Sequence, residues 1–146
     1  MQKQDKAKDK KKLSPEEYRS ILKDLEINSI SLKKSKSSLD DRFEMKPGME
    51  VAINTSSQYK NVKDNIIIEH SYKLFAKQPG GKIKMLEIEA IFKLELISKQ
   101  PFRDEFFEIY KDSSLMLNTW PFFREFVNNM TSRMDIPPLT LPFIKR

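Results

Sequence analysis

The sequence has no cysteine, one histidine and only three glycines among its 146 residues. Without cysteine there can be no disulfide, no thiol nucleophile and no cysteine-ligated zinc, and this composition suits a reducing cytoplasm. Two of the glycines are adjacent and mark a turn at Gly80–Gly81, so the chain has no glycine-rich loop of the kind that holds a phosphate. No apolar run reaches the roughly 18 residues that a membrane-spanning helix needs, and we expect no membrane insertion.

Residues that could carry catalysis are few and poorly placed. His70 lies on the apolar phase of an alternating segment over residues 65–75, where a core histidine is expected, and Glu69 points to the opposite face. A row of glutamates on the next alternating segment is interrupted by a lysine and is typical of a solvated strand face; these are Glu87, Glu89 and Glu95. We therefore predict no enzyme activity, no catalytic residue, no metal site and no cofactor.

The positive charge is concentrated at one end of the chain. The formal net charge is +6, and residues 1–12 hold six lysines and two aspartates. With almost no apolar side chain to bury, such a segment cannot offset its ordering entropy, so we predict a disordered basic tail over 1–13 and a single domain over 14–146. The tail is either an arm that binds RNA, the ribosome or an acidic partner, or a solubilising leader. The domain is nearly balanced in charge, which argues against nucleic acid as its partner.

Hydrophobic spacing predicts a short helix followed by strands. Ser14 and Pro15 form a helix start, and the apolar residues after them predict a helix at about 14–24. Alternation of period two then predicts strands, with a bulge near Ser29 and a polar loop over 35–47. The predicted strands cover about 25–34, a segment that starts at Met49 and ends before the connection at 60–64, and a hairpin of 65–76 and 83–98.

The helical period returns after Pro101. It predicts a short helix at about 103–111 and a longer one that Pro121 begins or kinks and that Pro137 ends. The apolar stripe of the longer helix is Trp120, Phe123, Val127, Met130 and Met134. An extended apolar tail follows over 139–143. Strands in one run and helices in another predict an α+β fold, a four-stranded antiparallel sheet with a helical layer on one face.

Aromatic residues are concentrated after residue 100, beyond what one helix on one sheet needs. They include Phe102, Phe106, Phe107, Tyr110, Trp120, Phe122, Phe123, Phe126 and Phe143. The surplus either fills a generous core or forms an oligomer interface or a peptide-binding surface. Composition alone leaves both interpretations open.

The C-terminal third resembles the signature of the SecB-like export chaperones. Residues 120–133 (WPFFREFVNNMTSR) and 136–142 (IPPLTLP) reproduce its proline and aromatic, its Arg-Glu pair, its apolar helix with a late arginine, and its Pro-x-Leu-x-Leu. The matching residues are Pro121, Arg124, Glu125, Val127, Met130, Arg133, Pro137, Leu139 and Leu141.

This resemblance implies a SecB-like fold and a homotetramer, a dimer of dimers, that holds unfolded polypeptides in apolar grooves without ATP. In the family this serves export through the Sec translocase motor, or protects the antitoxin of a toxin–antitoxin–chaperone system. It places Phe102 in the region that lines the groove, and we add Phe106, Phe107 and Tyr110 as client-binding candidates. Arg124 and Glu125 are expected to hold the helix or subunit contacts rather than clients.

The sequence departs from the family pattern in three respects. It ends at Arg146, where the family continues into a long C-terminal helix. It has a predicted helix at 14–24, where the export chaperone has a tail. Its strands lack the strong acidity with which the family docks the translocase motor.

Overall fold

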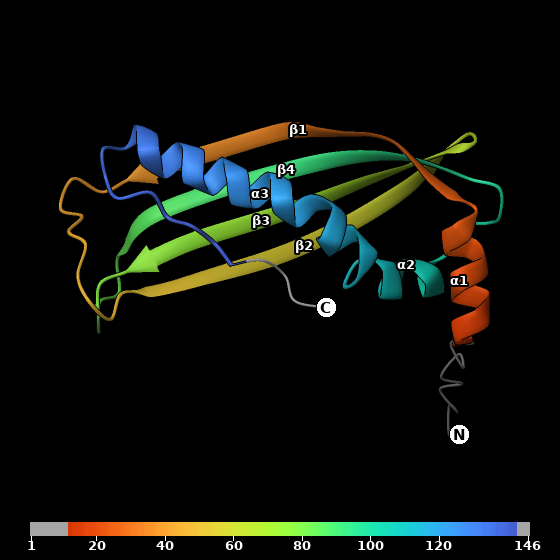
Figure 1. Cartoon of the computed structure of the whole chain (residues 1–146), viewed down its shortest axis with the longest axis horizontal. Coiled ribbons are helices and arrows are strands. Elements are labelled where there is room, and N and C mark those ends of the chain that lie inside the picture. Colours follow the sequence, from red (N-terminus) through yellow and green to blue (C-terminus); the bar gives the residue numbers. More distant parts are fainter. Residues whose placement is uncertain (1–11, 143–146) are drawn as a thin grey trace, which may run out of the picture.

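A computed structural model describes residues 12–142, so residues 1–11 of the predicted basic tail and residues 143–146 lie outside the described range. The elements in chain order are α1 (Pro15–Lys23), β1 (Leu25–Leu39), β2 (Glu50–Val62), β3 (Asn65–Lys77), β4 (Lys84–Ser98), α2 (Asp104–Tyr110) and α3 (Ser114–Arg133). The strands form one antiparallel sheet in the order β1-β4-β3-β2. As Figure 1 shows, α3 runs along one face of this sheet, and α1 and α2 lie together at one end. This α+β architecture confirms the predicted fold class.

Within 12–142 no helix is both long and apolar enough to cross a membrane.

The predicted hairpin is present as β3 and β4, the two central strands. Their register places His70 opposite Phe92 and Ile68 opposite Leu94. Every second residue of both strands is buried, and the residues between are partly or fully exposed. One sheet face therefore forms the core under α3, and the other faces solvent, as strict alternation predicts.

The first strand is longer than its sequence predicts. Pairing with β4 shifts register between Ile27 and Ser29, which confirms the predicted bulge, and shifts again between Leu32 and Lys34. The strand then continues to Leu39, so the prediction of a loop is wrong for residues 35–39. The reason is that β4 is long enough to offer backbone partners to this polar segment, and backbone pairing does not require apolar side chains.

The long helix begins earlier than predicted. It starts at Ser114, and Pro121 lies inside it rather than at its first position. Leu115 and Thr119, in the turns before the proline, are fully buried. Burial against the sheet therefore holds these turns in the helix although Pro121 has no N–H to donate.

The chain after α3 is extended, as predicted, and runs back along the helix. Trp120 Nε1 donates to the carbonyl of Pro142 at 2.8 Å, and Arg124 Nε donates to that of Leu141 at 2.6 Å. Near the end of α3, the backbone N–H of Leu139 donates to Thr131 Oγ1 at 2.9 Å. Leu141 is buried, so the tail closes the core on one side of α3.

Replacing Thr131 with valine should lower the free energy of unfolding by about 1–2 kcal/mol, because the Leu139 N–H loses its acceptor in a partly buried place. Ser132→Ala is the matched control. Ser132 is exposed, and its one side-chain bond within the described part of the chain is to the carbonyl of Asn128, so its loss should cost less than about 0.5 kcal/mol. Urea unfolding of both variants measures the difference, and equal losses would contradict a role for Thr131 in holding the tail.

Candidate functional site

An aromatic cluster lies at the end of the sheet where α2 follows β4. Phe102 precedes α2, and Phe106 and Tyr110 lie one turn apart on it, with stacked rings 5.5 Å between centroids. Phe102 meets Phe106 edge-on at 5.1 Å. Phe107 and, from β2, Tyr59 complete the group, with their centroids 4.6 Å apart. We call these five residues the aromatic cluster: Tyr59, Phe102, Phe106, Phe107 and Tyr110.

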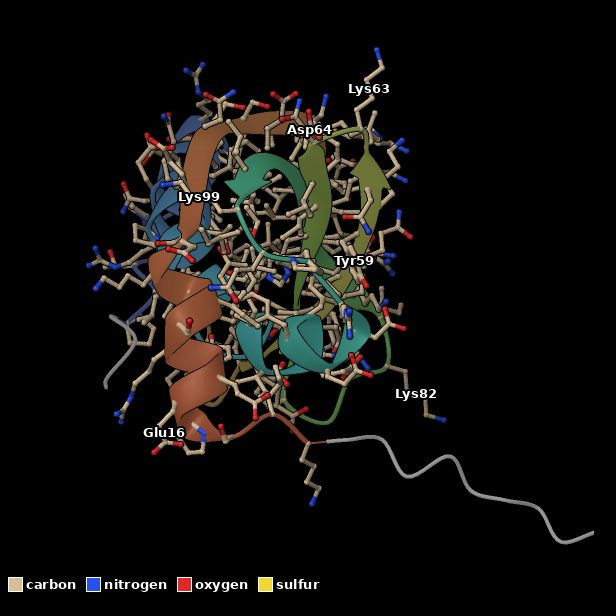
Figure 2. The ribbon with its side chains drawn as sticks, turned by 90° about the vertical axis from the view of Figure 1, so that its right-hand side faces the viewer. Glu16, Tyr59, Lys63, Asp64, Lys82 and Lys99 are labelled. Carbon is tan, nitrogen blue, oxygen red and sulfur yellow. The ribbon has the colours of Figure 1, made fainter. Side chains whose placement is uncertain are left out.

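All four predicted client-binding residues lie in this cluster, and all four are buried. Phe106 and Tyr110 expose 1% of their surface, and Phe102 and Phe107 expose 6%. Nothing in the sequence indicated that α1 would lie beside them. Figure 2 shows α1 and α2 side by side at this end of the molecule.

Tyr59 is the cluster member that the sequence interpretation missed. Its hydroxyl donates to the carboxylate of Asp104 in the first turn of α2. Burial, followed by this carboxylate, raises the pKa of Tyr59 to about 12, so the hydroxyl stays protonated. Figure 2 shows its position above α2. The sequence pattern could have identified it, because Tyr59 lies on the same face of its strand as Val51 and Ile53 in the two-residue alternation.

A hollow of about 250 Å³ opens beside the cluster, between the end of α1, β1 and the start of α3. It is lined by Leu22, Leu25, Ile27, Tyr110, Ser114, Leu117 and Asn118. Burial raises the pKa of Tyr110 to about 12. Further along the same side of the sheet, Leu32 on β1 and Phe122 on α3 are nearly half exposed. The apolar surface therefore continues from the hollow along the β1 edge.

The solvent-facing side of the sheet is of mixed charge. Lysines and glutamates alternate across neighbouring strands, and their ion pairs include Lys33–Glu69, Lys73–Glu89 at 3.9 Å and Lys93–Glu95 at 3.5 Å. The glutamates of β4 thus belong to a solvated strand face, as predicted. This face does not gather charge of one sign.

The motif residues lie on α3 and on the tail that follows it. Val127 and Leu141 are buried, and Met130 and Leu139 pack partly buried against the core. Arg124 binds the tail through Leu141. On the exposed side of α3, Asn129 donates to Glu125 at 3.3 Å and accepts from Arg133 at 3.2 Å. Pro121 and Pro137 are exposed.

His70 is a core residue, as its position on the apolar phase predicts. It is 1% exposed, and its Nδ1 lies 2.5 Å from Ser57 Oγ. Burial lowers the pKa of His70 to about 4, although the negative charge of Asp112 acts to raise it. Glu69 lies on the other face of the sheet, so the two form no dyad. In residues 12–142 no group of three or more His, Asp or Glu side chains is placed to hold a metal ion.

The sequence matches no protein-family model, and no curated protein matches it. Among solved structures, the chain is similar to the Mycobacterium tuberculosis Rv1957 SecB-like chaperone in complex with a ChAD peptide from the Rv1956 HigA1 antitoxin. The TM-score is 0.69 with 17% identity, over 84% of this chain and 93% of that one. A protein of unknown function from Streptococcus agalactiae has a TM-score of 0.46 at 12% identity, over 82% and 97% of the two chains, too low to argue from. The strand order, the helical layer and this likeness together show that the chain has the SecB-like fold.

Proposed function

We propose that the protein is an ATP-independent holdase that binds unfolded polypeptides through apolar surface. The likeness in fold to a SecB-like chaperone that holds an antitoxin peptide carries the proposal. It is supported by the hollow beside the aromatic cluster, whose lining includes Leu22, Ile27 and Leu117, and by the exposed Leu32 and Phe122. Burial of apolar surface does not depend on a particular client sequence, so the site requires an apolar segment rather than one exact sequence.

The client-binding residues in this proposal are Phe102, Phe106, Phe107 and Tyr110. We further propose a homotetramer, a dimer of dimers, in the cytoplasm. Ile27, Leu32 and Phe122 are exposed on the side of the sheet that carries α3. A second copy packed there would remove this apolar surface from water, which favours association.

A dedicated antitoxin is the client that we favour over an exported precursor. The related chaperone is bound to an antitoxin peptide. The solvent-facing sheet surface pairs lysines with glutamates, as at Lys73–Glu89 and Lys93–Glu95, so it offers little net charge for docking the translocase motor. Export through the Sec pathway remains the alternative role. Binding of RNA or the ribosome by the lysine-rich tail concerns residues 1–11, outside the described range.

The protein should suppress aggregation of a chemically unfolded client when both are diluted into buffer without nucleotide. We expect light scattering to fall in proportion to added protein, because bound clients are withheld from one another. An inert protein of similar size is the control. Unchanged aggregation at molar excess would contradict the holdase proposal. Light scattering of the protein alone should give a mass near four times 17.2 kDa, and a strict monomer would contradict the assembly.

A further inference from the structure

The N-terminal helix covers Phe106 of the aromatic cluster. The Tyr18 ring stacks on Phe106 with centroids 4.9 Å apart and planes 25° apart. Its hydroxyl lies 3.2 Å from Ser113 Oγ, beyond the end of α2. Leu13 and Ile21 line a hollow of about 250 Å³ together with Phe106. Phe106 is therefore buried by a segment that precedes the sheet in sequence.

This helix is attached through partly buried side chains, Tyr18, Ile21 and Leu22. α1 has nine residues, and none of them is fully buried. Among the described residues, its hydrogen bonds to the connection after β4 are all made by the Gln100 side chain. Gln100 Nε2 donates to Ser20 Oγ at 3.1 Å and to Asp24 Oδ2 at 2.6 Å. A helix of this length is not stable alone in water. Asp24 is the single residue between α1 and β1, so displacement of the helix requires a change in the backbone angles at this residue.

We propose that α1 is a displaceable cover and that Tyr18 occupies the place of a client's aromatic side chain on Phe106. This inference rests on the proposed function. The bound Tyr18 indicates which ligand this place accepts: a flat aromatic ring on the Phe106 face, with the Ser113 hydroxyl beside it for a polar edge. Client and α1 compete for one surface, so the affinity for clients is reduced by the fraction of molecules in which α1 is closed.

A cross-link that holds α1 in place tests the competition directly. Because the chain has no cysteine, a thiol reagent reacts only with cysteines that are introduced. In an S20C/Q100C variant, a short bismaleimide joins α1 to the connection after β4. We expect the locked protein to bind a fluorescein-labelled unfolded peptide rich in Phe and Tyr at least tenfold more weakly than the same variant capped with N-ethylmaleimide. Fluorescence anisotropy measures both affinities. Equal affinities of the locked and capped forms would overturn the proposal.

A second variant loosens the cover instead of locking it. Tyr18→Ala removes the ring that occupies Phe106, and we expect it to bind the same peptide about fivefold more tightly. Arg19→Ala is the matched control, because Arg19 is exposed on the same helix and should leave the affinity unchanged. Binding by Tyr18→Ala that is weaker than or equal to wild type contradicts competition.

The two levels of the hypothesis fail in different ways. If neither wild type nor the capped variant binds any unfolded peptide, the holdase function is wrong and the cover has no client to exclude. If all forms bind equally, the holdase function stands and the cover is wrong. Hydrogen exchange gives a further check. In the free protein, amides of α1 should exchange faster than those of β3 and β4, and added peptide should accelerate the exchange of the α1 amides. Protection of α1 equal to that of the sheet would also overturn the proposal.

Discussion

Replacing Phe123 with alanine should lower the free energy of unfolding by about 3–5 kcal/mol, the range for deleting a fully buried aromatic ring. Phe123 is fully buried and stacks on Tyr72 with centroids 4.5 Å apart and planes 9° apart. It also contacts Trp120 at 6.0 Å. Its removal would leave a cavity where α3 meets the sheet, and the surrounding rings can close that cavity only in part. Urea unfolding followed by circular dichroism measures the loss.

The adjacent residue provides the matched control. Phe122 is 47% exposed, and within residues 12–142 its one ring contact is with Phe92 at 6.2 Å. Phe122→Ala should cost less than about 1 kcal/mol in the folding of one chain, because nearly half of the side chain is already in water. Equal losses from the two variants would contradict the orientation of α3. If a second copy covers Phe122, this variant should instead lower the mass measured by light scattering.

Acidification should destabilise the protein through His70. Its pKa is about 4 when folded and 6.5 as the ordinary value, so the unfolded chain binds a proton that the folded chain refuses. The stability that neutral His70 supports is fully present above pH 6.5 and is lost as the pH falls toward 4. Between about pH 7.5 and about pH 5 the expected loss is about 2 kcal/mol, since one pKa unit corresponds to about 1.4 kcal/mol.

His70→Gln isolates this contribution from the carboxylates that titrate in the same range. Glutamine keeps a polar group near Ser57 Oγ, which lies 2.5 Å from His70 Nδ1, but it does not titrate. The variant should lose about 2 kcal/mol less than wild type over the same pH interval. Thermal unfolding at both pH values provides the comparison. Parallel pH dependence of the two proteins would show that His70 is solvated or charged in the folded state.

The sheet could be predicted best where the side chains alternate strictly. β3 and β4 bury one face completely, and a shift of one residue would expose every apolar side chain of that face. The pattern of residues such as Ile68 and Leu94 therefore fixes both strands within a residue or so. The polar end of β1 gave no such pattern. Residues 35–39 are held by backbone pairing with β4, which leaves no trace in side-chain type.

The candidate site was predicted in part. The resemblance to the SecB-like chaperones drew attention to Phe102, and Phe106, Phe107 and Tyr110 were candidates from the helix that follows it. Tyr59 comes from a strand some forty residues earlier, and its bond to Asp104 depends on how β2 lies against α2. Whether the four predicted residues bind clients stays a prediction.

The sequence by itself thus determined the helices and strands of this protein. The spacing of apolar residues separates strands from helices, Ser14 starts the first helix, and Pro137 follows the last one. The nearly balanced domain charge, with most of the excess in the first twelve residues, was also fixed by the sequence. Tertiary structure decided that α3 continues through Pro121, that β1 reaches Leu39 and that Tyr18 covers Phe106. These outcomes depend on burial and backbone pairing between distant segments, and such free energies belong to the assembled fold rather than to any one stretch of sequence.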